Sequence, residues 1–114
     1  MIPDLDLARA RAWVDRLNSD MPAAARTQIR YEIDVTDQAI TLVECRAPWN
    51  PDLGSTWSRA PVCRFRYTRT RNEWSLYWRD RNLEFHQYDP VAPTPHLDQL
   101  VNHVDSDHSG LFWG

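Results

Sequence analysis

The stretch VCRFRYTRTRNEWSLYWRDRNLEFHQY, residues 62–88, decides the fold. Apolar and polar side chains alternate along three short runs within it, and a period of two residues is typical of strands with one buried face. In the first run, one side carries Cys63, Phe65 and Tyr67, and the other side carries Arg64 and Arg66. The stretch therefore predicts an antiparallel meander with one aromatic face and one arginine-rich face.

The alternation also predicts how these strands pair, because a slip of one residue would mix the two faces. A two-residue turn at 71–72 would pair Tyr67 with Leu76. An even number of residues in the following turn would set His86 opposite Ser75. His86 is therefore expected on the arginine-rich face.

Two more strands are predicted upstream, in QIRYEIDV (28–35) and AITLVECR (39–46). A two-residue turn between them would pair Val35 with Ile40 and keep the apolar side chains on one face. After these strands comes a loop at 47–61, in which three prolines and one glycine disfavour regular structure.

Apolar residues recur at helical spacing near both ends of the chain, within 7–17 and 97–104. Asp4 or Asp6 could cap the first helix, and Thr94 could cap the second. The order helix, five strands, helix predicts an α+β fold: an N-terminal helix, an antiparallel meander sheet of about five strands, a C-terminal helix and a short aromatic tail. With 114 residues, the chain is expected to form one domain, 1–114.

Composition limits the possible partners. The net charge of −3 argues against a molecule that binds polyanions over its whole surface, yet residues 59–81 hold seven Arg against two acidic residues. No apolar run approaches the length of a membrane span, and the N-terminus lacks signal-peptide features, so we expect a cytoplasmic protein without membrane contact. Cys45 and Cys63 should then be reduced thiols in strands.

WSLYWRDRNLEFHQYD (74–89), the helix after Thr94 and the terminal SGLFWG (109–114) resemble a bacterial family, the domain of unknown function numbered 3024. The resemblance covers about residues 62–114. It implies no activity, because none is assigned to that family. It implies that such proteins end at Phe-Trp-Gly, so the aromatic tail would be an intended feature.

Aromatic residues outside the predicted elements form a first candidate site. They are Trp49, Trp57, Phe112 and Trp113, in the loop and the tail. Trp is enriched at interface hot spots, so these residues could contact a protein partner or a second copy in a homodimer. The alternative is that the loop and tail fold back and cap the open end of the sheet.

The arginine-rich face forms a second candidate site, made of Arg64, Arg66, Tyr77, Arg79, Arg81 and His86. Clustered Arg beside an aromatic ring suits phosphate, carboxylate or single-stranded nucleic acid. The alternative is a solvated face whose Arg pair with Glu84 or with acidic side chains such as Glu32 and Asp34. His86 with Glu84, Tyr77 and Arg79 could form a general acid–base cluster for phosphodiester cleavage, although a polar surface His is the simpler interpretation.

No catalytic, cofactor or metal motif is present in the sequence. GxGxxG, GxxxxGK, GxSxG and HExxH are all missing, so we expect no catalytic residue, cofactor or metal site. The first hypothesis is a non-enzymatic binding domain for a protein partner or for itself. The alternative is a nucleic-acid-binding or RNase-like module of the toxin–antitoxin type that uses the arginine-rich face.

Overall fold

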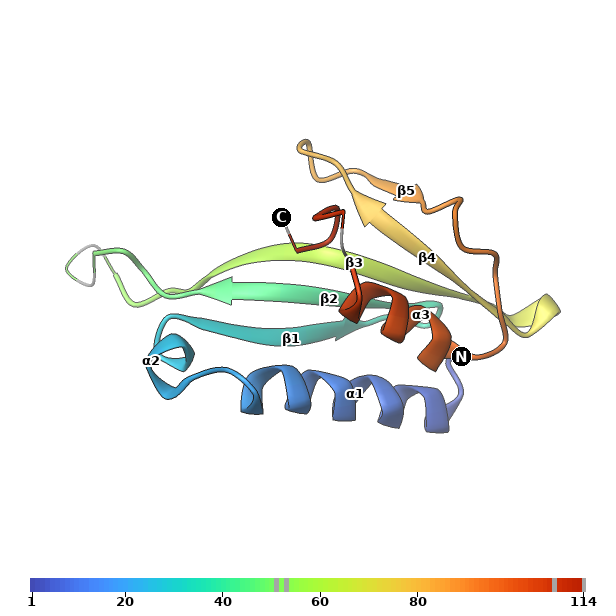
Figure 1. Cartoon of the computed structure of the whole chain (residues 1–114), viewed down its shortest axis with the longest axis horizontal. Helices are drawn as coiled ribbons and strands as arrows, with labels where there is room; N and C mark the ends of the chain where they lie inside the picture. Colours follow the sequence, from blue (N-terminus) through green and yellow to red (C-terminus); the bar gives the residue numbers. More distant parts are fainter. Residues whose placement is uncertain (51, 53, 108, 114) are drawn as a thin grey trace.

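The computed structural model describes residues 1–50, 52, 54–107 and 109–113, and it has the predicted α+β architecture. The elements in chain order are α1 (Asp4–Ser19), α2 (Ala23–Arg26), β1 (Ile29–Val35), β2 (Ala39–Arg46), β3 (Ser58–Thr68), the 3-10 helix η2 (Arg69–Arg71), β4 (Glu73–Arg79), β5 (Phe85–Gln87) and α3 (Leu97–Asp105). The five strands form one antiparallel sheet in the order β1-β2-β3-β4-β5 (Figure 1). None of the helices in the described residues is both long and apolar enough to span a bilayer.

One hydrophobic core contains side chains from α1, α3 and the central strands. Ile40, Phe65 and Leu76 form its sheet side, each at most 1% exposed. Trp13 of α1 packs edge-on against the ring of Phe65, with 5.8 Å between ring centroids. The other face of the sheet carries the arginine side chains, so the alternation in the sequence separated the two faces of β3 correctly.

Both helices begin differently from the prediction. α1 starts after Pro3 without a side-chain cap, so neither acidic candidate serves as its N-cap. Asp6 is instead buried and accepts the indole N–H of Trp74 at 3.0 Å, because a buried indole needs an acceptor. α3 starts at Leu97, and the hydroxyl of Thr94 accepts the N–H of His96 just ahead of it.

The hairpin of β1 and β2 has the predicted register, with Val35 opposite Ile40. β1 is an edge strand, and the side chain of Asn18 at the end of α1 lies against that edge. Its amide donates to the carbonyl of Tyr31 at 3.0 Å and accepts the N–H of Tyr31 at 2.8 Å. Asn18 thus satisfies both polar groups that Tyr31 presents outward from the sheet.

The predicted pairing of β3 with β4 is wrong by two residues. Tyr67 lies opposite Trp74, not Leu76, because the turn has four residues, 69–72. η2 supplies the first three, and Asn72 closes the turn with a φ of 51°, a left-handed conformation that Asn tolerates. A shift of two residues equals the period of the side-chain alternation, so each side chain stays on its predicted face.

The predicted pairing of β4 with β5 is wrong by an odd number of residues. Each side chain of β5 therefore lies on the face opposite to the predicted one. Five residues, 80–84, separate the paired residues Arg79 and Phe85, and Leu83 has a φ of 65°. His86 therefore lies opposite Trp78 rather than Ser75. His86 shares the aromatic face, and Phe85 takes its place on the arginine-rich face.

β3 begins at Ser58, four residues earlier than predicted, so the loop predicted for 47–61 ends at 57; its residues 51 and 53 lie outside the described part of the chain. Pro61 lies inside β3, next to a register shift between Leu42 and Val43 of β2. A bulge is a place where a strand tolerates proline, because the ladder is already interrupted there. The strand ends and this loop form an arm that projects from the elongated molecule, whose extents are 49 × 28 × 27 Å (Figure 1).

Candidate binding cleft

The sheet splits where β3 and β4 part. β3 pairs with β4 only from Cys63, which lies opposite Trp78, whereas its earlier residues pair with β2 alone. β4 and β5 then lead away from β3, and the C-terminal tail lies in the space between β3 and β4 (Figure 1). The split and the tail enclose an open cleft of about 970 Å³.

We call this space the fork cleft. Three groups of residues line it. β3 contributes Ala60, Pro61 and Val62. The charged residues are Glu44, Arg46, Arg79, Asp80 and Arg81, and the remaining residues are Trp78 of β4 and the tail residues Gly110, Leu111, Phe112 and Trp113. The volume lies at the upper end of the range for ligand sites in proteins. The fork cleft is therefore large enough for a short peptide segment.

Arg79 bridges the two diverging strands. Its Nε donates to the carbonyl of Pro61 on β3, and its Nη1 donates to the carbonyl of Asp80 at 3.3 Å. The carbonyl of Asp80 also accepts the N–H of Leu83, so Arg79 contacts the β4–β5 turn as well as β3. The guanidinium thus links β3 to the end of β4 while keeping its positive charge beside the cleft.

Asp107 fixes the tail as one wall of the cleft. Its carboxylate accepts the backbone N–H groups of Ser109 at 3.0 Å and of Phe112 at 2.9 Å, and the Ser109 hydroxyl at 2.6 Å. Burial raises the pKa of Asp107, but the hydrogen bonds from Ser109 and Phe112 outweigh it and lower the pKa below the usual value. The tail is thus held by a charged, hydrogen-bonded anchor.

Aromatic packing completes this wall. Phe112 is 6% exposed and packs edge-on against Tyr88, with 5.3 Å between centroids. Trp113 packs edge-on against Tyr31 at 5.7 Å and donates its indole N–H to the carbonyl of Val104 at 2.7 Å. The tail folds back onto the core, as in the capping alternative.

Charge in the cleft is mixed. Glu44 accepts from Nε of Arg46 at 2.6 Å, so this pair is internally balanced. Arg81 is exposed and forms no ion pair with any residue that the structure describes. The cation that a ligand could pair with at the lowest desolvation cost is therefore Arg81, with Arg79 beside it.

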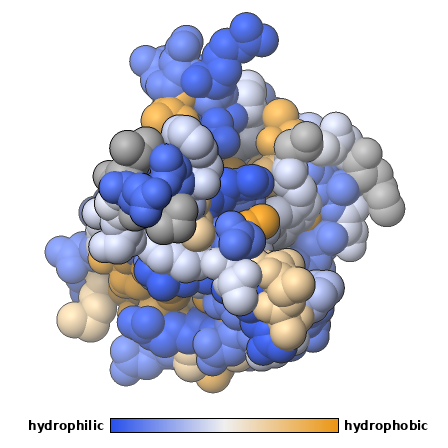
Figure 2. Space-filling view, turned by 90° about the vertical axis from the view of Figure 1, so that its left-hand side faces the viewer, coloured by the Kyte–Doolittle hydropathy of each residue, from blue (hydrophilic) through white to orange (hydrophobic). Residues whose placement is uncertain are grey.

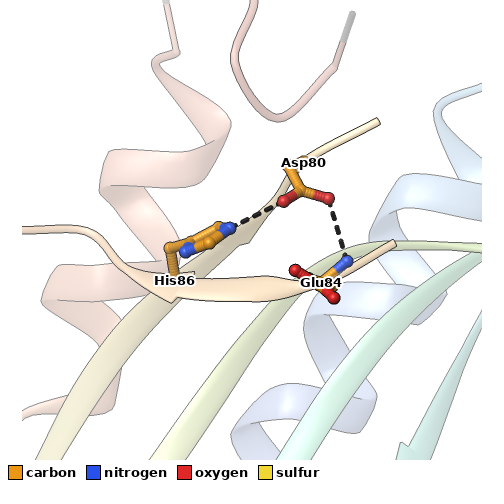
Figure 3. A group of neighbouring side chains, drawn as sticks. All are labelled: Asp80, Glu84 and His86. Atoms are coloured by element: carbon orange, nitrogen blue, oxygen red, sulfur yellow. Dashed lines mark hydrogen bonds and ion pairs between the residues drawn. The ribbon is translucent and has the colours of Figure 1, made fainter. Parts of the chain in front are cut away.

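Asp80 organises the turn at the rim of the cleft. One carboxylate oxygen accepts the backbone N–H groups of Asn82 at 2.8 Å and Glu84 at 3.0 Å, and the other bonds to Nε2 of His86 at 2.8 Å. The bond with His86, followed by those from the backbone, lowers the pKa of Asp80 below its usual value. Figure 3 shows Asp80 between His86 and the backbone of Glu84. The His86 ring also lies 5.0 Å from that of Trp78.

The four aromatic residues predicted as one contact surface do not form a single patch. Trp49 is 88% exposed in the arm. Trp57 lies under the guanidinium of Arg30, 4.4 Å from its ring centroid, so it belongs with the arginine-rich face. Phe112 is buried and Trp113 half-buried on the helix side. Viewed toward the arm, the surface is mainly hydrophilic with scattered apolar patches (Figure 2).

The six residues predicted as an anion site are also divided. Arg64 and Arg66 lie on the arginine-rich face with Tyr77, whereas Arg79 and Arg81 line the fork cleft. His86 is on the opposite face. The proposed acid–base arrangement of His86 across from Ser75 is therefore not formed.

The arginine-rich face itself has two different halves. On the β1 side, Arg59 pairs with Asp34 at 2.8 Å and with Glu32 at 3.4 Å, as the scaffold alternative predicted. On the β4 side, Arg64 stacks over Phe85 at 4.0 Å, and Arg66 is exposed. Only this second half offers guanidinium groups without a carboxylate partner among the described residues.

Both cysteines are free and buried, as predicted from their strands. Burial raises the pKa of the Cys63 thiol far above its usual value, with a further contribution from the charge of Asp105. The thiolate is the reactive form of cysteine, so Cys63 is unsuited to nucleophilic chemistry.

Sequence reasoning missed the two aspartates that shape the site, Asp80 and Asp107. In both, a carboxylate accepts the N–H two residues ahead, from Asn82 and from Ser109. Asp side chains often bond to the backbone two residues ahead, so the residue type was a general signal for such turns. The fork cleft itself had no comparable signal.

Comparison with known proteins identifies one family. A family model described as Domain of unknown function (DUF3024) matches residues 2–114. The match extends the resemblance from the second half of the sequence to nearly the whole chain. No curated protein and no solved structure matches.

Proposed function

We propose that the chain, which belongs to the family described as Domain of unknown function (DUF3024), is a binding domain that holds an extended segment of a protein partner in the fork cleft. It would act by binding rather than by catalysis. The observation that supports this proposal is the meeting of arginine and aromatic side chains in one open cleft of about 970 Å³.

The chemistry of the cleft suggests the partner. Arg81 has no carboxylate partner in the described part of the chain, and Arg79 lies next to it, so an acidic side chain would gain a charge-assisted hydrogen bond there. Trp78 and Leu111 offer apolar surface in the same cleft. We therefore expect a segment that combines an acidic residue with an apolar one.

The arm would provide a second contact. Trp49 is 88% exposed, and burying a large aromatic side chain is a common source of interface energy. The base of the arm, at Arg46 and Ala60, also lines the fork cleft, so one partner could touch both. Free buried thiols at Cys45 and Cys63 suit a reducing compartment, and we propose that this binding takes place in the cytoplasm.

Affinity capture from the native host, with quantitative mass spectrometry, tests the proposal. The baits are the wild-type chain, Trp49→Ser, Arg81→Glu and the matched control Leu5→Ser, whose residue is 64% exposed at the start of α1, away from the arm (Figure 1). We expect one set of proteins to be retained by Leu5→Ser and lost by both other variants. The same set on every bait, or none above background on any, would contradict the proposal. Capture of the chain itself would indicate a homodimer.

A second candidate is a nucleic-acid-binding surface on the β4 side of the arginine-rich face. The observation that favours it is the guanidinium of Arg64 over the ring of Phe85, 4.0 Å from its centroid, beside the exposed Arg66 and the half-buried Tyr77. Bases stack on such platforms, and phosphates pair with such cations.

Fluorescence anisotropy with a labelled single-stranded RNA tests this second candidate. We expect binding that weakens steeply with salt and is reduced by Arg66→Glu. The control is Arg11→Glu, which makes the same charge change at an exposed position of α1. Equal loss in both variants would indicate attraction to net charge alone and would exclude a specific surface.

A further inference from the structure

We propose that Asp80, Glu84 and His86 form a binding site for a divalent transition-metal ion, with Zn²⁺ as the representative case. Asp80 and Glu84 come from the β4–β5 turn and His86 from β5, and each offers one ligand atom within 4.8 Å of the others (Figure 3). Within the described residues, this is the one group of three His, Cys, Asp or Glu side chains that converges so closely. The inference is independent of the proposed partner in the fork cleft.

Two of the ligands are already oriented. Asp80 is held by the backbone N–H groups of Asn82 and Glu84 on one oxygen, which leaves the other oxygen directed at Nε2 of His86. The His86 ring is held against Trp78. Outer contacts of this kind fix the direction of metal ligands in proteins and raise their affinity.

The distances fit an ion with small adjustments. Zn²⁺ lies about 2.0–2.2 Å from imidazole nitrogen and carboxylate oxygen, so tetrahedral ligand atoms are roughly 3.3 Å apart. The nitrogen of His86 and the oxygen of Asp80 are 2.8 Å apart and would separate by a few tenths of an ångström. Glu84 is exposed, and its side chain can rotate to complete the set.

The types of ligand atom in this group also favour a transition-metal ion. One imidazole and two carboxylates suit Zn²⁺ and its neighbours in the Irving–Williams series better than Mg²⁺, which prefers oxygen ligands alone. Three protein ligands leave a fourth position for water or for a group from a partner. The nearby positive charge of Arg81 opposes the ion, so we expect micromolar affinity rather than that of a closed structural site.

Isothermal titration calorimetry of the full chain with zinc chloride tests the site. We expect one Zn²⁺ per chain, with binding at least about tenfold weaker in His86→Ala and in Glu84→Gln, because even outer-shell contacts contribute that much. His96→Ala is the matched control, since His96 is exposed and outside the group. Its affinity should equal that of the wild type.

Glu84→Gln guards against a folding artefact. Glu84 bonds to Asp80 through backbone groups alone: its N–H donates to the Asp80 carboxylate, and its carbonyl accepts the Asp80 N–H. The substitution therefore removes a ligand oxygen and keeps both turn contacts. Near-UV circular dichroism confirms that each variant is folded. No binding of Zn²⁺ to the wild-type chain would overturn the proposal, as would wild-type affinity in both His86→Ala and Glu84→Gln.

Discussion

Replacing Phe112 with alanine should strongly destabilise the whole domain, although the residue lies two positions from the end of the chain. Phe112 is 6% exposed and packs on Tyr88, so its side chain is part of the core. A buried Phe→Ala substitution costs about 3–5 kcal/mol in free energy of unfolding. A terminal segment can also leave its site locally, which limits the cost, so we expect about 3 kcal/mol.

Urea unfolding followed by tryptophan fluorescence measures this loss. With a slope of roughly 1.5 kcal/mol per molar urea, the midpoint should fall by about 2 M. Leu111→Ala is the control in the same tail, because Leu111 is 38% exposed, and its midpoint should move much less. Equal shifts in the two variants, or no shift in Phe112→Ala, would refute the conclusion that the tail is part of the core.

Three further outcomes follow from contacts already described. Trp74→Phe removes the N–H that satisfies buried Asp6 and should cost about 2–4 kcal/mol in urea unfolding, whereas Trp49→Phe should be neutral. The pKa of Asp80, measured by carboxyl-carbon NMR, should lie below the usual value and return toward it in His86→Gln. Because that pKa is lowered on folding, the contribution of Asp80 to stability is present above the unfolded-state pKa and is lost as pH falls through the folded-state pKa. Ellman's reagent should not label Cys63 in the native protein and should label it in urea; rapid native labelling would contradict its burial.

Side-chain alternation predicted the faces of β1 to β4 because a period of two depends only on the local sequence. Tyr67 and Trp74 are both on the aromatic face, although their pairing was predicted with a shift of two residues. The length of a turn is a separate quantity. Asn72 marked the end of the β3–β4 turn, but its start in η2 had no signal.

The β4–β5 turn shows why one face was assigned wrongly. A residue whose backbone is left-handed is usually Gly or Asn, which can be recognised in a sequence. Here the residue is Leu83, with a φ of 65°. The hydrogen bonds that the Asp80 carboxylate accepts from Asn82 and Glu84 stabilise this turn, but the presence of Asp alone did not predict the length of the turn. Because the turn has an odd number of residues, His86 lies opposite Trp78, on the other face from the one predicted. The group proposed as a metal site depends on this position of His86.

The fork cleft depends on contacts between distant segments, so local patterns could not predict it. It needs the bulge near Pro61, the divergence of β4 and the return of the tail. Pro61 was read as a residue of the loop, although a proline is also tolerated in a strand at a bulge. That second possibility was the one available clue.

The contact between Asn18 and Tyr31 has a consequence for solubility. A sheet with exposed edges can recruit strands from other copies and grow into aggregates, and proteins protect such edges in several ways. Here an amide side chain occupies the donor and the acceptor that an incoming strand would need at the middle of β1. The last residues of α1 therefore keep this edge from propagating into a larger sheet, while β1 itself keeps its regular alternation of apolar and charged residues.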